Sequence, residues 1–181
     1  VDAANKLLDE IDESLDKVNV KVKHMCEGNH DAWLNGFVEE HPYLPQYKFN
    51  NACNLAKRGY KYHIMGEYLK VGKLYFYHGH HFGGQYHTAN HLRKLGCNIM
   101  YGHWHSMQQD SVTHMDGPKS AWSIGCLKDM RGEKNAWLGG RQHKWAHGFA
   151  IVDYYSKGRF TVHPIQIVDG RASVWGEEIK G

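Results

Sequence analysis

The amino-acid sequence predicts an α/β protein with a mixed first half and a strand-rich second half. Two observations lead to this fold class. Apolar residues repeat every three or four positions near the N-terminus, which is typical of a helix with one buried face. From residue 97 onward, apolar runs alternate with turn signals, which is typical of β-strands. Because 181 residues suit one well-packed domain, we expect residues 1–181 to form a single domain of packed sheets with helices outside them.

The first half of the chain is expected to alternate helices with strands. The apolar spacing predicts a helix over residues 3–18, and the alternation in VKVKHMC predicts a strand over 20–26 that ends in a loop at EGNHD. Shorter helices are expected over 32–41, which a pair of prolines ends, and over 51–58, which a glycine ends.

The rest of the chain is expected to be mainly strands. The segment EYLKVGKLYFY reads as a hairpin that turns at Gly72, and HTANHLRKLG reads as a helix that ends at Gly96. The run CNIMY reads as a short strand. Further strands are predicted in SVTHM, SAWSIGCL, AHGFAIVDYY and RFTVHPIQIV, with turns at 116–117 and 156–158.

Composition and charge exclude several classes of protein. With 41% hydrophobic and 23% charged residues, the chain is neither disordered nor fibrous, and a net charge of +3 permits an anionic substrate without requiring one. The four cysteines form no CxxC pair, which excludes a zinc ribbon and favours buried free thiols. No apolar run spans a bilayer and no signal peptide is present, so we expect a soluble, cytoplasmic protein with no membrane partner.

Histidine is the unusual residue of this chain, with 15 copies, several of them in three short segments. These segments are GNHD at 28–31, HGHH at 78–81 and GHWH at 102–105, and each follows a predicted strand. Because ligand sites in α/β sheets gather at the carboxyl ends of strands, the three segments are expected to meet. In GHWH, an extended backbone would point His103 and His105 to the same side. Neutral imidazole and amide oxygen suit Mn, Fe or Zn better than Mg.

The order GNHD, HGH, GHxH resembles the calcineurin-like metallophosphoesterase superfamily, and the tail from SVTHM to the RFTVHPIQIV strand resembles the second sheet of that family. The resemblance implies an α/β/β/α sandwich of two mixed sheets flanked by helices, of which this chain is the C-terminal portion. It also implies two divalent metal ions in the complete protein, with Mn, Fe or Zn as the expected ions.

The resemblance also implies roles for individual residues. Asn29, His78 and His103 would bind one metal, and His105 would bind the other. His30 would be the general acid at the leaving oxygen, with Asp31 orienting or charge-stabilising its imidazole. Two further assignments have a weaker basis. His80 and His81 follow His78 and are candidates for substrate binding, and the equally favoured alternative is that both are exposed loop histidines.

This sequence departs from the family at its N-terminus. The strand-end DxH motif and the GDxxD motif, whose aspartate bridges the two metals, are absent. The chain opens on Val1 without a methionine, so we interpret it as an N-terminally incomplete domain that lacks its first strands and holds one metal or none. Trp104 is a second departure, because a smaller residue commonly separates the two histidines; it is expected to narrow the site or to pack behind it.

The favoured function is hydrolysis of a phosphodiester, with nucleic acid as a possible substrate, by water activated on a metal ion. A phosphomonoesterase or protein phosphatase stays open within the same chemistry. Two alternatives come from other classes of protein. One is a catalytically silent scaffold with the metallophosphoesterase fold, which the missing aspartates support, and the other is a simple histidine-rich metal-binding module.

Other chemistry-bearing residues have a plainer interpretation. His87 and His91 share a helix face, but no metalloprotease pattern follows, so a surface helix is favoured. The segment SIGCL lacks a second glycine and a triad, and Cys126 is expected to be buried and inert. Residues 128–145 mix basic residues with two tryptophans, which can stack bases, but a solvated connection whose tryptophans cover the core is favoured.

Overall fold

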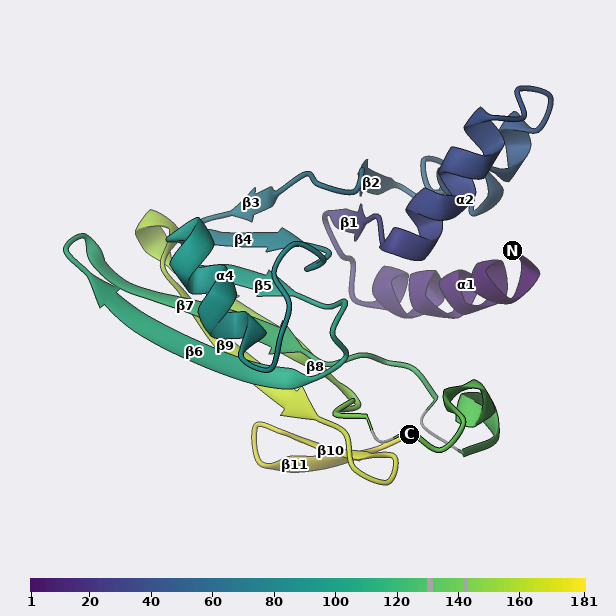
Figure 1. Ribbon diagram of the computed structural model, residues 1–181. Coiled ribbons are helices and arrows are strands. Elements are labelled where there is room, and N and C mark those ends of the chain that lie inside the picture. The colour runs from purple at the N-terminus through teal and green to yellow at the C-terminus, as the bar shows by residue number, and fades with distance from the viewer. Residues whose placement is uncertain (130–131, 142) are drawn as a thin grey trace. The chain divides into compact units, whose positions relative to one another are not determined.

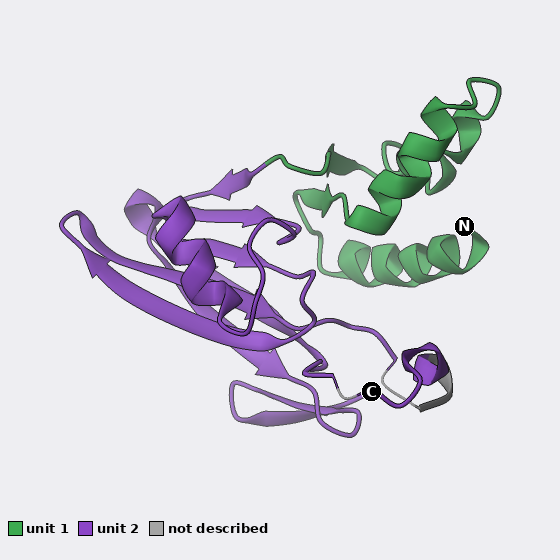
Figure 2. Ribbon diagram, viewed as in Figure 1, with its two compact units in different colours: residues 1–67 green, residues 68–181 purple. Residues whose placement is uncertain are grey.

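The computed structural model describes residues 1–129, 132–141 and 143–181, and this part of the chain forms two compact units, residues 1–67 and residues 68–181 (Figure 2). Both units contain helices and strands, so the predicted α/β class is confirmed (Figure 1). The finer prediction, a sandwich of two mixed sheets flanked by helices on both sides, stays a prediction, as does the single domain.

Unit 1 packs an N-terminal helix against a short parallel strand pair. Leu8 of the helix is buried together with Cys53 and Leu55, and Met25 packs against this cluster from the first strand. Arg58 joins the helix to the following turns through ion pairs to Asp9 at 2.6 Å and to Asp12 at 2.8 Å. The elements of unit 1 are α1 (Asp2–Lys17), β1 (Lys23–Cys26), α2 (Asn29–Glu39), η1 (Pro45–Tyr47), α3 (Phe49–Ala52) and β2 (Tyr60–His63).

The predicted elements of unit 1 are present with shifted ends. α1 matches its prediction, β1 starts three residues later than predicted, and α2 starts three residues earlier. GNHD is therefore the start of a helix rather than a loop. The helix predicted over 51–58 is wrong beyond Ala52, because Asn54 adopts a left-handed conformation with φ of 52° and interrupts it. β2, which pairs with β1, has only four residues and gave too short a pattern to predict.

Unit 2 is built on a mixed five-stranded sheet with the order β3-β4-β5-β7-β6, in which β4, β5 and β7 run parallel. The predicted hairpin joins β3 to β4, and the turn predicted at 116–117 joins β6 to β7 one residue earlier, at Met115 and Asp116. The elements of unit 2 are β3 (Leu69–Val71), β4 (Leu74–Tyr77), α4 (His87–Leu95), β5 (Ile99–Tyr101), β6 (Met107–His114), β7 (Gly117–Ile124), η2 (Gly132–Leu138), β8 (Gly148–Tyr154), η3 (Ser156–Gly158), β9 (Phe160–Gln166), β10 (Arg171–Val174) and β11 (Glu177–Lys180).

The five-stranded sheet is covered on both faces. On one face, Leu92 of α4 is buried with Ile99 and Tyr101 of β5. On the other face, Met100 is buried among side chains of the antiparallel pair β8 and β9, including Val152. Ile99 and Tyr101 face α4 whereas Met100 faces β8 and β9, because successive side chains of a strand point to opposite faces of the sheet. α4 ends as predicted at Gly96, whose φ of 62° suits a residue without a Cβ.

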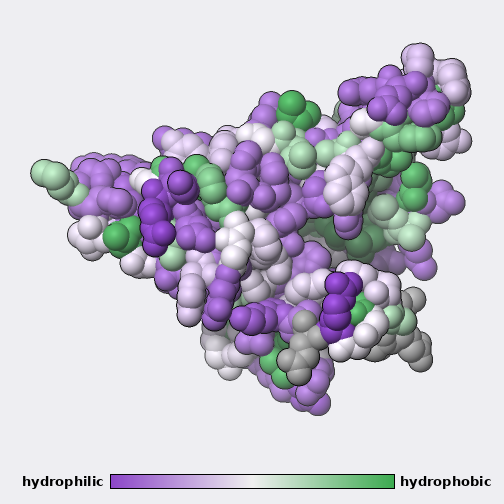
Figure 3. Space-filling view, viewed as in Figure 1, coloured by the Kyte–Doolittle hydropathy of each residue, from purple (hydrophilic) through white to green (hydrophobic). Residues whose placement is uncertain are grey.

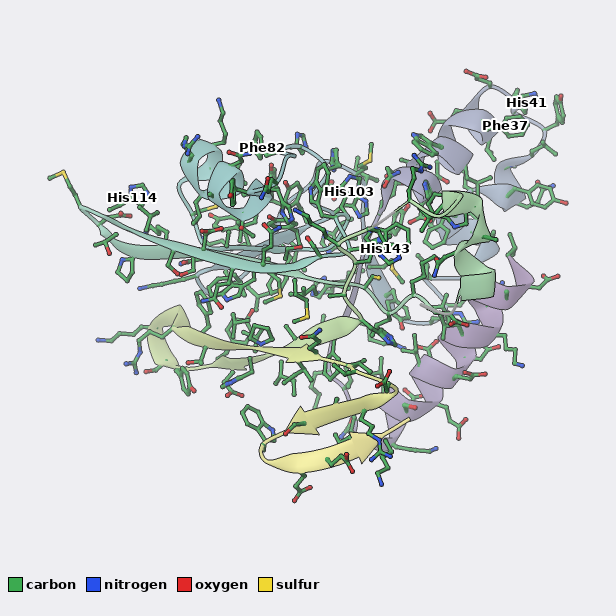
Figure 4. The ribbon with its side chains drawn as sticks, turned by 60° about the horizontal axis from the view of Figure 1, so that its bottom comes forward. Phe37, His41, Phe82, His103, His114 and His143 are labelled. Carbon is green, nitrogen blue, oxygen red and sulfur yellow. The ribbon has the colours of Figure 1, made fainter. Side chains whose placement is uncertain are left out.

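The outer surface carries both polar and apolar side chains. The face drawn in Figure 3 is largely hydrophilic, with hydrophobic residues reaching it over the helical part of unit 1. In α2, Trp33 is 66% exposed and Phe37 is 53% exposed. Phe37 stacks on His41 at a ring separation of 4.2 Å (Figure 4). Within the described residues, no helix has both the length and the apolar character needed to cross a membrane.

Candidate functional site

Two predicted metal ligands, His78 and His103, lie together in unit 2. They follow β4 and β5, which are parallel neighbours and end in register at Tyr77 and Tyr101. The Nε2 atom of His78 and the Nδ1 atom of His103 are 2.9 Å apart, and the two rings meet edge to face. The expectation that strand ends bring the histidine segments together is thus confirmed for this pair.

The backbone of GHWH differs from the expectation. β5 ends at Tyr101, and His103 and His105 both have left-handed backbones, with φ of 53° and 56°. The prediction that the two histidines share one side of an extended strand is therefore wrong. The cause is a tight turn, in which the Trp104 N–H donates to the Gly102 carbonyl at 2.6 Å. Each left-handed residue costs about 1–2 kcal/mol, and such strain gathers at functional sites.

Trp104 packs behind the histidines, which is one of the two roles expected for it. Its indole N–H donates to the Gly79 carbonyl at 3.0 Å, and its ring stacks on His87 at 5.4 Å. A Cβ at Gly83 would lie 2.6 Å from the indole, so only glycine leaves room for the ring there. The tryptophan thereby ties the HGHH loop to the GHWH turn.

His80 and His81 lie beside the ligand pair with different environments. The His80 ring is 6.0 Å from that of His78 and 4.0 Å from that of His81. The Nδ1 atom of His80 is shielded from solvent and has no hydrogen-bond partner among the described residues, whereas His81 is exposed. Burial, followed by the nearby His81 and His103, lowers the pKa of His80 and favours its neutral form.

His87 and His91 are buried, so the prediction of a surface position for them is wrong. They are 2% and 0% exposed, because α4 turns this face onto the sheet. His87 uses both ring nitrogens, with Nδ1 2.7 Å from the Tyr101 hydroxyl and Nε2 2.8 Å from Ser106 Oγ. The Nδ1–H of His91 donates to the His87 carbonyl at 2.6 Å, which leaves its Nε2 to accept from the Tyr77 hydroxyl.

This buried network lies directly under the candidate site. Tyr77 and Tyr101 immediately precede the HGHH and GHWH segments, and their hydroxyls are held by the two α4 histidines. Burial lowers the pKa of His87 to about 4 and raises the pKa of Tyr101. The network is therefore neutral at pH 7. Sequence reasoning missed it, because the pattern of α4 does not show which face meets a sheet.

The GNHD residues belong to unit 1 and open helix α2. Asn29 is partly buried, and His30 is exposed with its ring 4.8 Å from Trp33. Asp31 accepts the Gly28 N–H at 3.0 Å, so its carboxylate caps the helix, and burial raises its pKa. Because these residues and the unit 2 histidines lie in separate compact units, their predicted meeting stays a prediction.

A second pair of facing histidines was missed at the sequence level. In unit 1, His24 Nδ1 on β1 and His63 Nε2 on β2 are 2.8 Å apart, and Glu67 Oε2 is 3.7 Å from His63 Nδ1. Each histidine stands alone in its strand, and β2 itself was not predicted. Only the parallel pairing of the two strands brings the rings together.

The metal ligands proposed for unit 2 fit a divalent ion in part. The 2.9 Å between His78 and His103 is a hydrogen-bond distance, and two nitrogens bound at about 2.1 Å to one ion lie that close only when the bonds meet near a right angle rather than tetrahedrally. Nowhere in the described ranges do three or more His, Cys, Asp or Glu side chains gather to hold a metal. Comparisons with protein families and with curated proteins find no match.

Proposed function

We propose that this chain belongs to a metal-dependent phosphoesterase that hydrolyses a phosphodiester. The observation that carries the proposal is the contact between His78 and His103 at the carboxyl ends of two adjacent parallel strands. Its support from the sequence is the ordered set GNHD, HGH and GHxH, which resembles the calcineurin-like metallophosphoesterases. The expected fold is the α/β/β/α sandwich of that superfamily, and the mixed α/β architecture is compatible with it.

The residues have distinct tasks in this proposal. Asn29, His78 and His103 would hold one divalent ion, and His105 would contribute to a second; Mn, Fe or Zn suit these donors. When bound, the ion would supply an activated water and neutralise charge on the phosphate oxygens. His30, which is exposed at the first turn of α2, donates a proton to the leaving oxygen, and Asp31 holds that turn through Gly28. His80 and His81 would contact the substrate; the His80 ring lies 6.0 Å from that of His78 and 4.0 Å from that of His81.

The test is metal binding and hydrolysis by the same protein. The chain is purified, loaded with Mn(II) or Zn(II), and assayed for bound metal and for hydrolysis of bis(p-nitrophenyl) phosphate and p-nitrophenyl phosphate. His78→Ala and His103→Ala are expected to lose the metal, whereas His30→Asn is expected to keep the metal and lose turnover. His114→Ala is the matched control, because His114 is exposed at the far end of the β6–β7 hairpin from His103 (Figure 4).

A catalytically silent scaffold is the second candidate function. This sequence contains neither DxH nor GDxxD, and the family resemblance implies that the aspartate of GDxxD bridges the two metals. The two candidates differ in one result. A wild-type protein that binds metal through His78 and His103 but hydrolyses neither ester would be a scaffold or a metal-binding module.

A further inference from the structure

Trp145 lies at the centre of an aromatic cluster beside the GHWH turn. Its ring meets His105 edge to face at 4.9 Å and lies tilted against the His143 ring, with 4.6 Å between the ring centres. Trp137 of η2 approaches the same ring at 5.8 Å. Figure 4 labels His143 of this cluster and His103 of the turn, which belong to segments 40 residues apart in the sequence.

The backbone fixes the position of this cluster. The Ala146 N–H donates to the His105 carbonyl at 2.6 Å, and the Cys126 N–H donates to the Ala146 carbonyl at 3.0 Å. A Cβ at Gly125 would lie 2.6 Å from the Ala146 oxygen, so the glycine of SIGCL permits this close approach. Trp145 is therefore held next to His105 by the two main-chain hydrogen bonds of the residue that follows it, Ala146.

The cluster is open to solvent, contrary to the expectation that both tryptophans cover the core. Trp137 is 62% exposed, and Trp145 is partly exposed. An exposed indole contributes little to the core, whereas its flat face is suited to stacking on a nucleobase. Residues 130, 131 and 142 of the connection lie outside the described residues.

Charge and shape favour a nucleic-acid strand as the occupant. Residues 127–147 contain five Lys or Arg residues and two acidic residues, and the ammonium of Lys128 lies 5.4 Å from the Trp145 ring centre. Trp145 also forms one wall of a groove of about 930 Å³. This volume lies within the range of small-ligand sites. Because Asp129 and Asp169 also line the groove, it suits a base, whose amino groups donate to carboxylates, better than a phosphate.

We propose that Trp137, His143 and Trp145 form a stacking platform for the bases of single-stranded nucleic acid. Stacking on Trp145 places a base beside His105, so that the phosphate next to that base faces the histidines of GHWH and HGHH. If the protein is the proposed phosphoesterase, the platform makes single-stranded nucleic acid its substrate class, and this part of the inference rests on the proposed function. The binding itself requires no metal.

The experiment measures the affinity of a fluorescein-labelled single-stranded 12-mer by anisotropy in EDTA. Trp137→Ala is expected to weaken binding about 5- to 150-fold, the effect of losing one stacked base. Trp145→Ala is expected to act similarly, and Trp145→Phe, which keeps a ring in the same packing, is expected to restore most of the affinity. Trp175→Ala is the matched control, because Trp175 is 64% exposed outside the cluster.

Three results would overturn the platform. They are no binding of the oligonucleotide, an affinity that Trp137→Ala leaves unchanged, and equal binding of heparin and of the oligonucleotide, because heparin carries charge without bases. A different result refutes the phosphoesterase proposal alone. In that case the oligonucleotide binds in EDTA, but bis(p-nitrophenyl) phosphate is not hydrolysed in the presence of Mn(II). Intact ester hydrolysis without oligonucleotide binding would refute only the platform.

Discussion

Acid is expected to destabilise unit 2 through the buried imidazole of His87. Burial lowers the pKa of His87 from 6.5 to about 4, so the folded state binds a proton less readily than the unfolded state. Stability is therefore unaffected by this group above pH 6.5, falls as the pH drops from 6.5 towards 4, and levels off below 4. The full difference corresponds to about 3 kcal/mol, and about 2.5 kcal/mol of it is reached at pH 4.5.

The assay is urea unfolding at pH 7 and pH 4.5, followed by tryptophan fluorescence, because five of the six tryptophans belong to unit 2. His87→Gln is expected to be less stable than the wild type at pH 7, since it loses the fit to Tyr101 and Ser106. Between pH 7 and pH 4.5 the free energy of unfolding of His87→Gln should fall by about 2 kcal/mol less than that of the wild type. His114→Gln, which changes an exposed histidine, should fall as the wild type does. An equal fall in His87→Gln would refute the assignment to His87.

Two further predictions concern packing in unit 2. Leu74 is 0% exposed and lies between the sheet and the β8–β9 pair, so Leu74→Ala should lower the free energy of unfolding by about 2–5 kcal/mol in a urea titration. Met115→Ala, at a fully exposed position, should change this free energy little in the same titration. Gly79→Ala places a Cβ 2.6 Å from the Tyr101 ring at a φ of +108°, and should cost about 1–3 kcal/mol by thermal unfolding. A Gly79→Ala protein as stable as the wild type would show that the HGHH loop moves aside easily.

Helices, strands and loops could be predicted from the sequence to different extents. The first helix and the helix ending at Gly96 were predicted nearly to the residue, since amphipathic spacing and a glycine stop are local signals. β2 and the start of α2 were missed. Four residues carry too little periodicity to indicate a strand, and Gly28 gives no side-chain signal for a helix start.

The candidate site shows the same division. The contact between His78 and His103 could be predicted, because both follow apolar strands and parallel neighbours end at one edge. The left-handed turn at His103 and His105 could not, since neither residue is a glycine and the turn is set by Trp104 packing against the HGHH loop. The contact of His105 with Trp145 joins residues 40 apart in the chain and depends on the pairing of Ala146 with the turn.

The sequence by itself determined the α/β class, the succession of most elements and the placement of histidines after strands, because periodicity, turn residues and strand ends are written locally. Only the tertiary structure decided which histidines are buried and which face one another. His87 and His91 became core residues when α4 turned their face onto the sheet, and His24 met His63 when β1 paired with β2. Burial and pairing depend on which surfaces meet across the fold, and no local pattern specifies them.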